Sequence, residues 1–299
     1  MKIMHKFSII TAVYNRAHLL QNVYQSIVKQ SITDVEWIVV DDGSEDNCRE
    51  VVKSFKSSFP IIYLHQKNAG KHAALNRGIT KSNSFFTVII DSDDVLYNDD
   101  TLETVWNLNN ELNLKKMNCS SISGLCLDRK LEVIGNTFPL RKDNSFIVSD
   151  HINMRFNKNI SGDKCEFFLT DVLKRYPFPL LKDEKFLTEA VVWNRIAHDY
   201  KTVYVNIPFK LVEYLQDGLS SKIDLLFTNN MRGYMLYFNE GSIRPFKIKL
   251  RLLHAMNYIK VAHHLGYSCL KIFIGANNKL FFLPALCLAI VRGKKSINI

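Results

Sequence analysis

Two carboxylates one residue apart are the first feature of this sequence that could do chemistry. The apolar run Phe85–Asp91 ends in Asp91, and Asp93 lies in the polar turn that follows. Mg²⁺ and Mn²⁺ prefer oxygen ligands, and they bind few protein carboxylates together with phosphate oxygens. A turn without any ligand is the alternative, because Asp is common in turns. The position directly after a buried strand favours the metal site.

Two further polar segments also contain residues that could bind a ligand. The run Val35–Asp41 leads into Asp41 and Asp42, which either form an Asp-Gly turn or accept hydrogen bonds from a nucleobase or a ribose. Gly70 and Lys71 open a helix whose free backbone N–H groups favour an anion such as a phosphate. A solvated helix N-terminus is the alternative for that second segment.

The first third of the chain must position these residues, and it alternates between strand and helix patterns. Strands are expected at Phe7–Val13, Val35–Asp41, Ile61–His65 and Phe85–Asp91, and helices at Ala17–Gln30, Asn47–Phe55 and Gly70–Thr80. This order predicts an α/β fold, a doubly wound and mostly parallel sheet with helices on both faces. Ligands of such sheets bind beyond the carboxyl ends of the strands, so we expect the polar residues at the four ends to converge.

The patterns of the second half are weaker. Helices are expected from Asp99 to Leu114 and over Thr188–His198, with irregular β structure between them. Pro208 lies between two strand patterns, Val203–Asn206 and Phe209–Leu215, and is expected to split them.

Composition and charge narrow the class of protein. The chain has 299 residues, of which 47% are hydrophobic and 23% charged, as in a globular protein. The net charge of +10 belongs to residues 241–299, which hold ten Lys and Arg and no acidic residue. The six cysteines include no C-x-x-C pair, which argues against a zinc ribbon or a disulfide scaffold and fits a reducing cytosol. Neither G-x-x-x-x-G-K-[ST] nor G-x-G-x-x-G occurs, which disfavours a P-loop ATPase and a dinucleotide dehydrogenase.

The ordered motifs resemble those of the family 2 glycosyltransferases of bacterial surface-polysaccharide type. They are T-x-x-Y-N from Thr11, V-D-D-G-S from Val40, N-x-G from Asn68 with a second N-x-G from Asn76, and D-S-D-D from Asp91. The resemblance is strong over residues 6–100 and weaker over about 160–220. It implies the nucleotide-sugar-binding GT-A fold and a nucleotide-sugar donor.

The resemblance also implies roles for individual residues. Thr11, Tyr14 and Asp41 match positions that line the base and ribose pocket. Asp91 resembles the carboxylate on the ribose and metal side, and Asp93 the direct ligand of Mn²⁺ or Mg²⁺. The metal ion would stabilise the diphosphate leaving group. The other residues expected to bind the donor are Asp42, Gly70, Lys71, Asn76 and Ser92.

One departure from the family motif concerns positive charge. The family carries A-R-N-x-G, whereas this chain has Leu75 in place of the arginine before Asn76. Lys71 or Arg77 is expected to supply the missing charge.

A base on the acceptor side is also required, because the attacking hydroxyl must lose a proton. The segment Phe186–Arg195 resembles the family's E-D helix, and alignment on Arg195 puts Glu189 at the base position, after Thr188. The alternative is that Glu189 only favours the helix dipole. Asp183 and Glu184 are the next candidates.

The sequence therefore predicts an inverting glycosyltransferase of the hexosyltransferase type, with a UDP-sugar as the expected donor. The expected acceptor is a growing glycan or its lipid-linked precursor. The alternative is a catalytically idle nucleotide-sugar-binding or scaffolding protein of a polysaccharide assembly system. A nucleotidyltransferase is disfavoured because no Gly-rich activating loop follows the first strand. We expect a donor-binding half at 1–115, an acceptor half at 116–220 and a basic, apolar helical extension at 221–299. The stretch Gln216–Ser220 either closes over the donor or forms a plain turn.

The basic extension predicts peripheral binding to the cytoplasmic face of the plasma membrane. Ile248, Leu252, Met256 and Ile259 share one helical face, and Leu280–Val291 is an apolar run too short to span a bilayer. The alternatives are packing on the catalytic domain or a homodimer formed through the extension. Nucleic-acid binding is disfavoured because no recognised binding module accompanies the charge.

Overall fold

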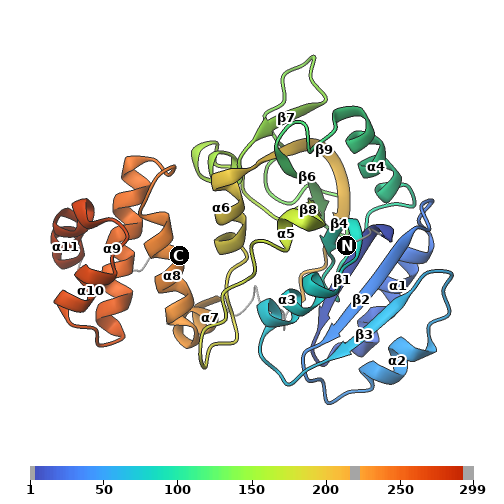
Figure 1. Ribbon diagram of the computed structural model, residues 1–299, viewed down its shortest axis with the longest axis horizontal. Coiled ribbons are helices and arrows are strands. Elements are labelled where there is room, and N and C mark those ends of the chain that lie inside the picture. The colour runs from blue at the N-terminus through green and yellow to red at the C-terminus, as the bar shows by residue number, and fades with distance from the viewer. Residues whose placement is uncertain (1–3, 216–222, 292–299) are drawn as a thin grey trace.

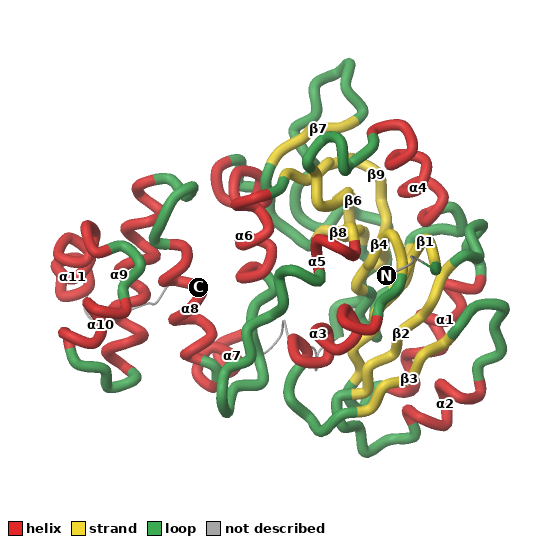
Figure 2. Tube along the Cα trace, viewed as in Figure 1, coloured by secondary structure: helices red, strands yellow, loops and turns green. Residues whose placement is uncertain are grey.

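A computed structural model describes residues 4–215 and 223–291 of the chain. Over these residues the strands form one sheet in the order β3-β2-β1-β4-β8-β6-β9-β5, and β7 pairs with β9 (Figures 1 and 2). The strands are β1 (His5–Val13), β2 (Val35–Asp41), β3 (Ile61–His65), β4 (Ser84–Ile89), β5 (Val95–Leu96), β6 (Cys119–Leu127), β7 (Phe146–Ser149), β8 (Lys164–Leu169) and β9 (Lys201–Leu211).

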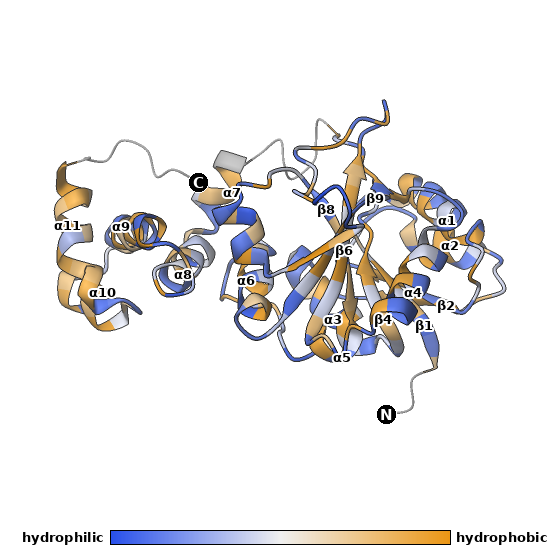
Figure 3. Ribbon diagram, turned by 90° about the horizontal axis from the view of Figure 1, so that it is seen from above, coloured by the Kyte–Doolittle hydropathy of each residue, from blue (hydrophilic) through white to orange (hydrophobic). Residues whose placement is uncertain are grey.

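The first four strands form a parallel half-sheet, and all four were expected from the sequence. Parallel pairing joins β1 to β2, β1 to β4 and β2 to β3. Every residue of β2 is buried, as a strand covered on both faces requires. The helices of this half are α1 (Leu20–Val28), α2 (Cys48–Ser54), α3 (Lys71–Lys81) and α4 (Thr101–Leu112). Figures 1 and 3 show α3 on one face of the sheet, with α1 and α2 on the other.

Close packing of α3 on the sheet depends on Gly78. A Cβ atom at this position would lie 2.6 Å from Cγ2 of Ile10 and 3.3 Å from Cγ2 of Val40. Leu75, one turn earlier, is completely buried in the core. The chain has thus replaced the arginine of the family motif by a core residue, and that position contributes packing and no charge.

The second half of the sheet differs from the expectation in two places. Strand β8, which the sequence did not reveal, runs antiparallel between β4 and β6. Strand β9 is continuous through Pro208, because register shifts against β6 between Ser123 and Leu125 accommodate the proline. The expected split at Pro208 was therefore wrong. Two helices complete this half, α5 (Thr170–Leu173) and α6 (Ala190–Asp199).

The C-terminal helices form a separate hydrophobic core beside the sheet domain (Figure 1). They are α7 (Ile223–Asn229), α8 (Met231–Gly241), α9 (Ile248–His264), α10 (Cys269–Gly275) and α11 (Phe282–Val291). Met256 and Ile259 are buried in this core, so the α9 face that the sequence assigned to membrane docking is not available. None of the helices in the described ranges is long and apolar enough to cross a membrane.

Candidate active site

The polar residues at the four strand ends converge, as expected. Ser44, after β2, accepts a hydrogen bond from the backbone N–H of Asn15, which follows β1 (3.0 Å). The backbone N–H groups of Ala69 and Gly70 donate to the carboxylate of Asp42 at 2.9 and 2.8 Å. These contacts bring the polar segments after β1, β2 and β3 to one edge of the sheet.

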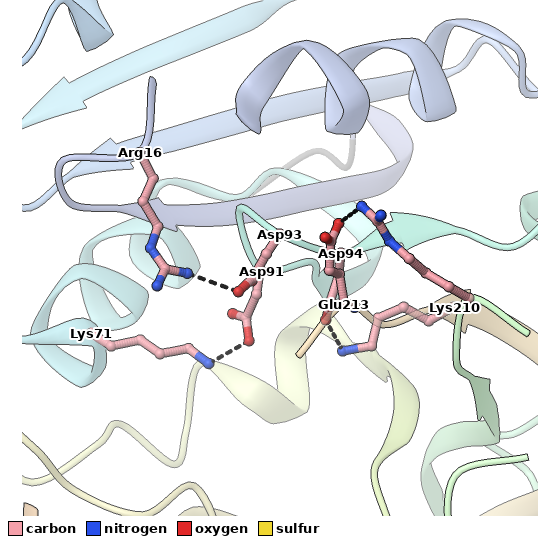
Figure 4. A network of polar contacts seen from close by, with 8 residues as sticks. Arg16, Lys71, Asp91, Asp93, Asp94, Lys210 and Glu213 are labelled. Atoms are coloured by element: carbon pink, nitrogen blue, oxygen red, sulfur yellow. Dashed lines mark hydrogen bonds and ion pairs between the residues drawn. The ribbon is translucent and has the colours of Figure 1, made fainter. Parts of the chain in front are cut away.

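The segment after β4 joins this edge through ion pairs (Figure 4). Lys71 Nζ lies 2.8 Å from Asp91 Oδ2, and Arg16 Nη1 lies 2.8 Å from Asp93 Oδ2. Asp94 is paired with Lys210 of β9 at 2.6 Å. Three cations from three different segments therefore compensate three neighbouring carboxylates.

The surrounding charges give the three carboxylates different proton affinities. Burial acts to raise the pKa of Asp91, but the charges of Lys71 and Lys210 outweigh it and lower that pKa. Burial and the charge of Asp91 raise the pKa of Asp93. Burial raises the pKa of Asp94 to about 6, although Lys210 opposes the shift. The ionised form of Asp91 is thus the most strongly stabilised of the three.

The carboxylates fit a divalent cation that binds together with a phosphate-bearing ligand. Asp91 Oδ1 is buried and, in the described part of the chain, has no hydrogen-bond partner. Such an atom is costly to bury unless a ligand satisfies it. Residues 4–215 and 223–291 contain no group of three or more His, Cys, Asp or Glu that could hold a metal ion. Mg²⁺ commonly uses only one or two protein carboxylates with phosphates and water, so Asp91 and Asp93 are a sufficient protein contribution.

Glu189 lies across the site from the strand ends and is linked to them by Lys71. Its Oε1 is 2.9 Å from Lys71 Nζ, the same ammonium that contacts Asp91. Glu189 precedes α6 and is half-buried. The pKa of Lys71 is raised because Asp91 and Glu189 overcome the effect of burial. The expected base and the expected metal ligand are therefore neighbours of one cation.

The two reserve candidates for the base lie elsewhere. Glu184 accepts hydrogen bonds from the backbone N–H groups of Arg232 (2.7 Å) and Gly233 (2.8 Å), at the start of α8. Asp183 is exposed and has a positive φ of 64°. Neither lines the cavity beside Asp91 and Glu189.

The residues expected around the base and ribose take three different positions. Tyr14 is 48% exposed just beyond β1. Asp41 accepts hydrogen bonds from the Ser44 N–H (2.8 Å) and from the Tyr63 hydroxyl, and these lower its pKa against the opposing effect of burial. Thr11 is completely buried, and its Oγ1 accepts a hydrogen bond from Trp37 Nε1 at 3.1 Å.

Two other residues that were expected to bind the nucleotide-sugar donor, Gly70 and Asn76, instead contact the backbone of this chain. Gly70 has a φ of 94°, and a Cβ there would lie 1.9 Å from the carbonyl oxygen of Lys185. Asn76 donates to and accepts from the backbone of Phe178, both at 2.8 Å. Arg77 donates to the His65 carbonyl oxygen at 2.6 Å and is exposed. Of the two cations expected to replace the motif arginine, only Lys71 faces the carboxylates.

A cavity of about 550 Å³ opens between the strand-end carboxylates and the second half of the sheet. Asp91, Asp93 and Lys71 line one side of it. The side chains around the rest of the wall come from β8, β9, α6, α8 and the segment 138–163, and they include Glu166, Glu189, Trp193, Tyr204, Lys210 and Tyr237. Ser92 is buried and is not among the lining residues, and Gln216–Ser220 lies outside the described residues.

Sequence reasoning missed three charged residues of this region. Arg16 follows the T-x-x-Y-N motif directly, and that position was the available signal. Lys210 and Glu166 lie within strands, where no spacing pattern distinguishes them.

Comparison with known proteins finds a family match in the first part of the chain. Residues 8–114 match the model of "Glycosyl transferase family 2". An uncharacterized glycosyltransferase of Escherichia coli (strain K12), YibD, is 35% identical over 94 residues, which are 31% of this chain and 27% of that protein. The match thus spans about a quarter of the relative's length.

A second relative matches over most of both chains. It is the GalNAc(5)-diNAcBac-PP-undecaprenol beta-1,3-glucosyltransferase of Campylobacter jejuni, 27% identical over 271 residues, with 87% of this chain and 82% of that protein covered. Among solved structures, S. aureus TarS 1-349 in complex with UDP-GlcNAc aligns with a TM-score of 0.63 at 17% identity, covering 95% of this chain and 80% of that one. The two proteins therefore share a fold, the GT-A fold of glycosyltransferases.

Proposed function

We propose that this chain, whose residues 8–114 match the model of glycosyl transferase family 2, is an inverting glycosyltransferase. It moves a sugar from a nucleoside-diphosphate sugar to a hydroxyl of a glycan or a lipid-linked glycan. The observation that carries the proposal is the position of Lys71, which contacts both Asp91 and Glu189. The donor-side carboxylates and a carboxylate suited to act as the base thus face one cavity.

In the proposed reaction some residues of this chain act on the leaving group and others act on the attacking hydroxyl. Asp91 and Asp93 would hold Mn²⁺ or Mg²⁺, which when bound supplies positive charge to the diphosphate leaving group. Glu189 accepts the proton of the attacking acceptor hydroxyl. Lys71 stabilises the ionised carboxylate of Glu189 and orients it toward Asp91.

We propose a UDP-sugar as the donor. Tyr14 and Asp41 border the edge where the base and ribose would lie, and Asp42 holds the loop of Ala69 and Gly70 that leads into α3. The S. aureus protein that shares this fold binds UDP-GlcNAc, which supports the choice of nucleotide. The name of the C. jejuni relative supports a lipid-linked glycan as the acceptor.

The test is turnover of a panel of UDP-, GDP-, dTDP- and ADP-sugars by the full-length protein, with Mn²⁺ and with chelator. We expect hydrolysis of one UDP-sugar, stimulated by the metal ion. Tight binding of a nucleotide sugar without turnover, with or without glycan acceptors, would favour the idle scaffolding protein instead.

The helical extension supports a second element of the proposal, attachment to an anionic membrane surface. Figure 3 shows that α10 and α11 carry mostly hydrophobic residues. Leu280 is 88% exposed and Leu283 is 70% exposed, and Ile274 and Ile290 are exposed as well. Residues 241–299 are basic without any acidic residue, so the surface charge complements anionic lipid. We therefore propose that the enzyme attaches to the cytoplasmic face of the membrane, where a lipid-linked acceptor would lie.

Co-sedimentation with anionic and neutral vesicles tests this attachment. The double variant Leu280→Glu, Leu283→Glu should lose binding to anionic vesicles, whereas Leu131→Glu, at an exposed leucine of the sheet domain, should bind as the unmodified chain does. If the unmodified chain binds neither kind of vesicle, the membrane role is excluded, and if the double variant binds as the unmodified chain does, the face of Leu280 and Leu283 is not the attachment site. A concentration-dependent dimer that only the double variant abolishes would assign the face to a second copy of the chain.

A further inference from the structure

The cavity contains a carboxylate for which the proposed reaction has no use. Glu166 lies in the middle of β8, and β8 is paired on both edges, with β4 and with β6. Its neighbours Cys165 and Phe167 point into the hydrophobic core. A carboxylate in such a central strand is costly to desolvate, so its presence there calls for a ligand or a partner.

The protein satisfies only part of the hydrogen-bonding capacity of the Glu166 carboxylate. Among the described residues its one hydrogen bond is accepted by Oε1 from Ser123 Oγ, at 3.1 Å. Ser123 is the residue directly opposite it on β6. The side chain lines the same cavity as Glu189, and its Oε2 accepts no hydrogen bond from the described residues. The site is therefore built to accept a further hydrogen bond from a molecule in the cavity.

The cations of the cavity wall are already engaged. Lys71 contacts Asp91 and Glu189, and Lys210 contacts Asp94. Lys164 Nζ donates to the carbonyl oxygens of Ile134, Ser161 and Asp163, at 3.1, 2.9 and 3.1 Å. Arg155 Nη1 donates to the carbonyl oxygens of Ile160 and Gly162, each at 3.1 Å. These pairings hold loops in place, so the wall offers a ligand few cationic donors.

The acidic groups of the wall outnumber these cations. They are Asp91, Asp93, Asp94, Asp163, Glu166, Glu189 and Glu213. An anionic ring in the cavity would be repelled, whereas a ring with hydroxyl groups would find acceptors for them. Trp193, Tyr204 and Tyr237 add aromatic surface, which suits the C–H faces of a sugar ring.

We propose that Glu166 binds the acceptor by accepting a hydrogen bond from one of its ring hydroxyls, and that the acceptor ring is an uncharged sugar and not a uronic acid. This inference rests on the proposed function, because it assigns the cavity to the acceptor of that reaction. Glu166 is an acceptor-binding residue and Glu189 remains the base.

The protonation behaviour of Glu166 gives a readout that a structural residue would lack. Burial raises its pKa to about 7, with a further contribution from Glu189, while Ser123, Lys210 and Lys164 oppose the shift. His151, whose pKa burial lowers to about 4, and Tyr204 line the space beside Glu166, and the thiols of Cys126 and Cys165 also lie within its electrostatic reach. Below a pH of about 7 the protonated carboxyl accepts a weaker hydrogen bond, so acceptor affinity should fall.

The experiment measures binding of simple sugars to the full-length protein by saturation-transfer NMR, without nucleotide. The probes are the methyl glycosides of glucose, galactose, N-acetylglucosamine and N-acetylgalactosamine, with methyl glucuronide and methyl galacturonide as the anionic counterparts. We expect binding of at least one neutral glycoside and of neither uronide. Glu166→Gln should weaken that binding by about tenfold and remove its pH dependence. Glu111→Gln, an exposed position of α4, should match the unmodified chain.

Three results would overturn the proposal. They are equal binding of the uronides, unchanged affinity in Glu166→Gln, and no binding of any neutral glycoside. Binding of UDP to the same samples separates this failure from failure of the proposed function. If UDP binds and the sugars behave otherwise than expected, only the assignment of Glu166 is lost. If UDP fails to bind, the donor assignment fails whatever the sugars do.

Discussion

The two halves of the sheet hold their charged groups in different ways. In the parallel half, the carboxylates Asp41, Asp42, Asp91 and Asp93 lie at or just beyond strand ends, where loops and cations surround them. In the second half, Glu166 and Lys210 lie within β8 and β9. The carboxyl ends of parallel strands converge without further cost, whereas a charge inside a central strand must be desolvated.

This difference indicates a division of roles. A diphosphate and a metal ion carry full charges, and the loops at the strand ends can gather several carboxylates and cations around them. A neutral sugar offers only hydroxyl groups to the protein. A strand within the sheet can hold one carboxylate oxygen in a defined position, where it accepts a hydrogen bond from such a hydroxyl. Variants in the two halves should therefore separate donor effects from acceptor effects.

The largest effect should follow removal of the donor-side carboxylate of Asp93. Asp93→Asn keeps the size of the side chain and its contact with Arg16 but loses the charge that would hold the metal ion. Transfer should fall by roughly 10³-fold, because electrostatic stabilisation of a leaving group contributes that much. Turnover of the UDP-sugar at saturating Mn²⁺ measures it, with thermal unfolding as the control for folding. Full activity in the presence of chelator would remove the metal role.

Glu189→Gln should give the next largest effect, and on the acceptor side alone. The amide keeps the contact with Lys71 but cannot take the proton, so turnover should fall by about 10²-fold or more. Affinity for UDP should stay the same, as calorimetric titration would show. A collapse of UDP affinity with turnover preserved would make Glu189 a donor-side residue and break the division between the halves.

The same difference between the halves explains which parts of the fold and of the site could be predicted from the sequence alone. The parallel half was predictable, because β-branched runs such as β2 are buried on both faces and their polar ends repeat the family motifs in order. Strand β8 was missed because Lys164 and Glu166 interrupt its apolar pattern, and those two side chains face the cavity. The pairing of Asn76 with Phe178 joins residues far apart in the sequence, so no local spacing could reveal it. The prediction of a membrane-docking face on α9 was wrong, because helical periodicity shows that a face is apolar but does not show which residues cover it.

A smaller effect should follow loss of the link between the halves. Asn76→Ala removes both hydrogen bonds to the backbone of Phe178, whose side chain is buried. The free energy of unfolding should fall by roughly 2–3 kcal/mol, because the partner groups are left poorly satisfied. Denaturant unfolding measures it, and Asn110→Ala, at an exposed position of α4, serves as the control. Affinity for UDP should remain unchanged in the folded protein. A selective loss of UDP affinity, without loss of stability, would restore Asn76 to the donor site.

The smallest effect concerns stability and Glu166. Burial raises the pKa of this carboxyl in the folded protein to about 7, from its ordinary value of 4.5. The folded state therefore holds the proton more tightly than the unfolded state, and the contribution of Glu166 to stability is lost as pH rises through about 7. Glu166→Gln has no such loss, so it should be more stable than the unmodified chain by roughly 1–2 kcal/mol at about pH 8 and by much less at about pH 5. The expected gain is smaller than the difference between the two pKa values alone would give, because Glu166 is partly exposed to water in the cavity.

Urea unfolding of the two proteins at both pH values measures this difference. A variant that gains stability while losing affinity for the sugar would show that Glu166 is retained for binding, at a cost to the fold. A variant that is less stable at both pH values would show the opposite, that Glu166 supports the pairing of β8 with β6 through Ser123. In that case the proposed contrast between the two halves of the sheet would no longer hold. Glu166 would stabilise the strand pairing, and the second half would hold no carboxylate that is retained for binding a ligand.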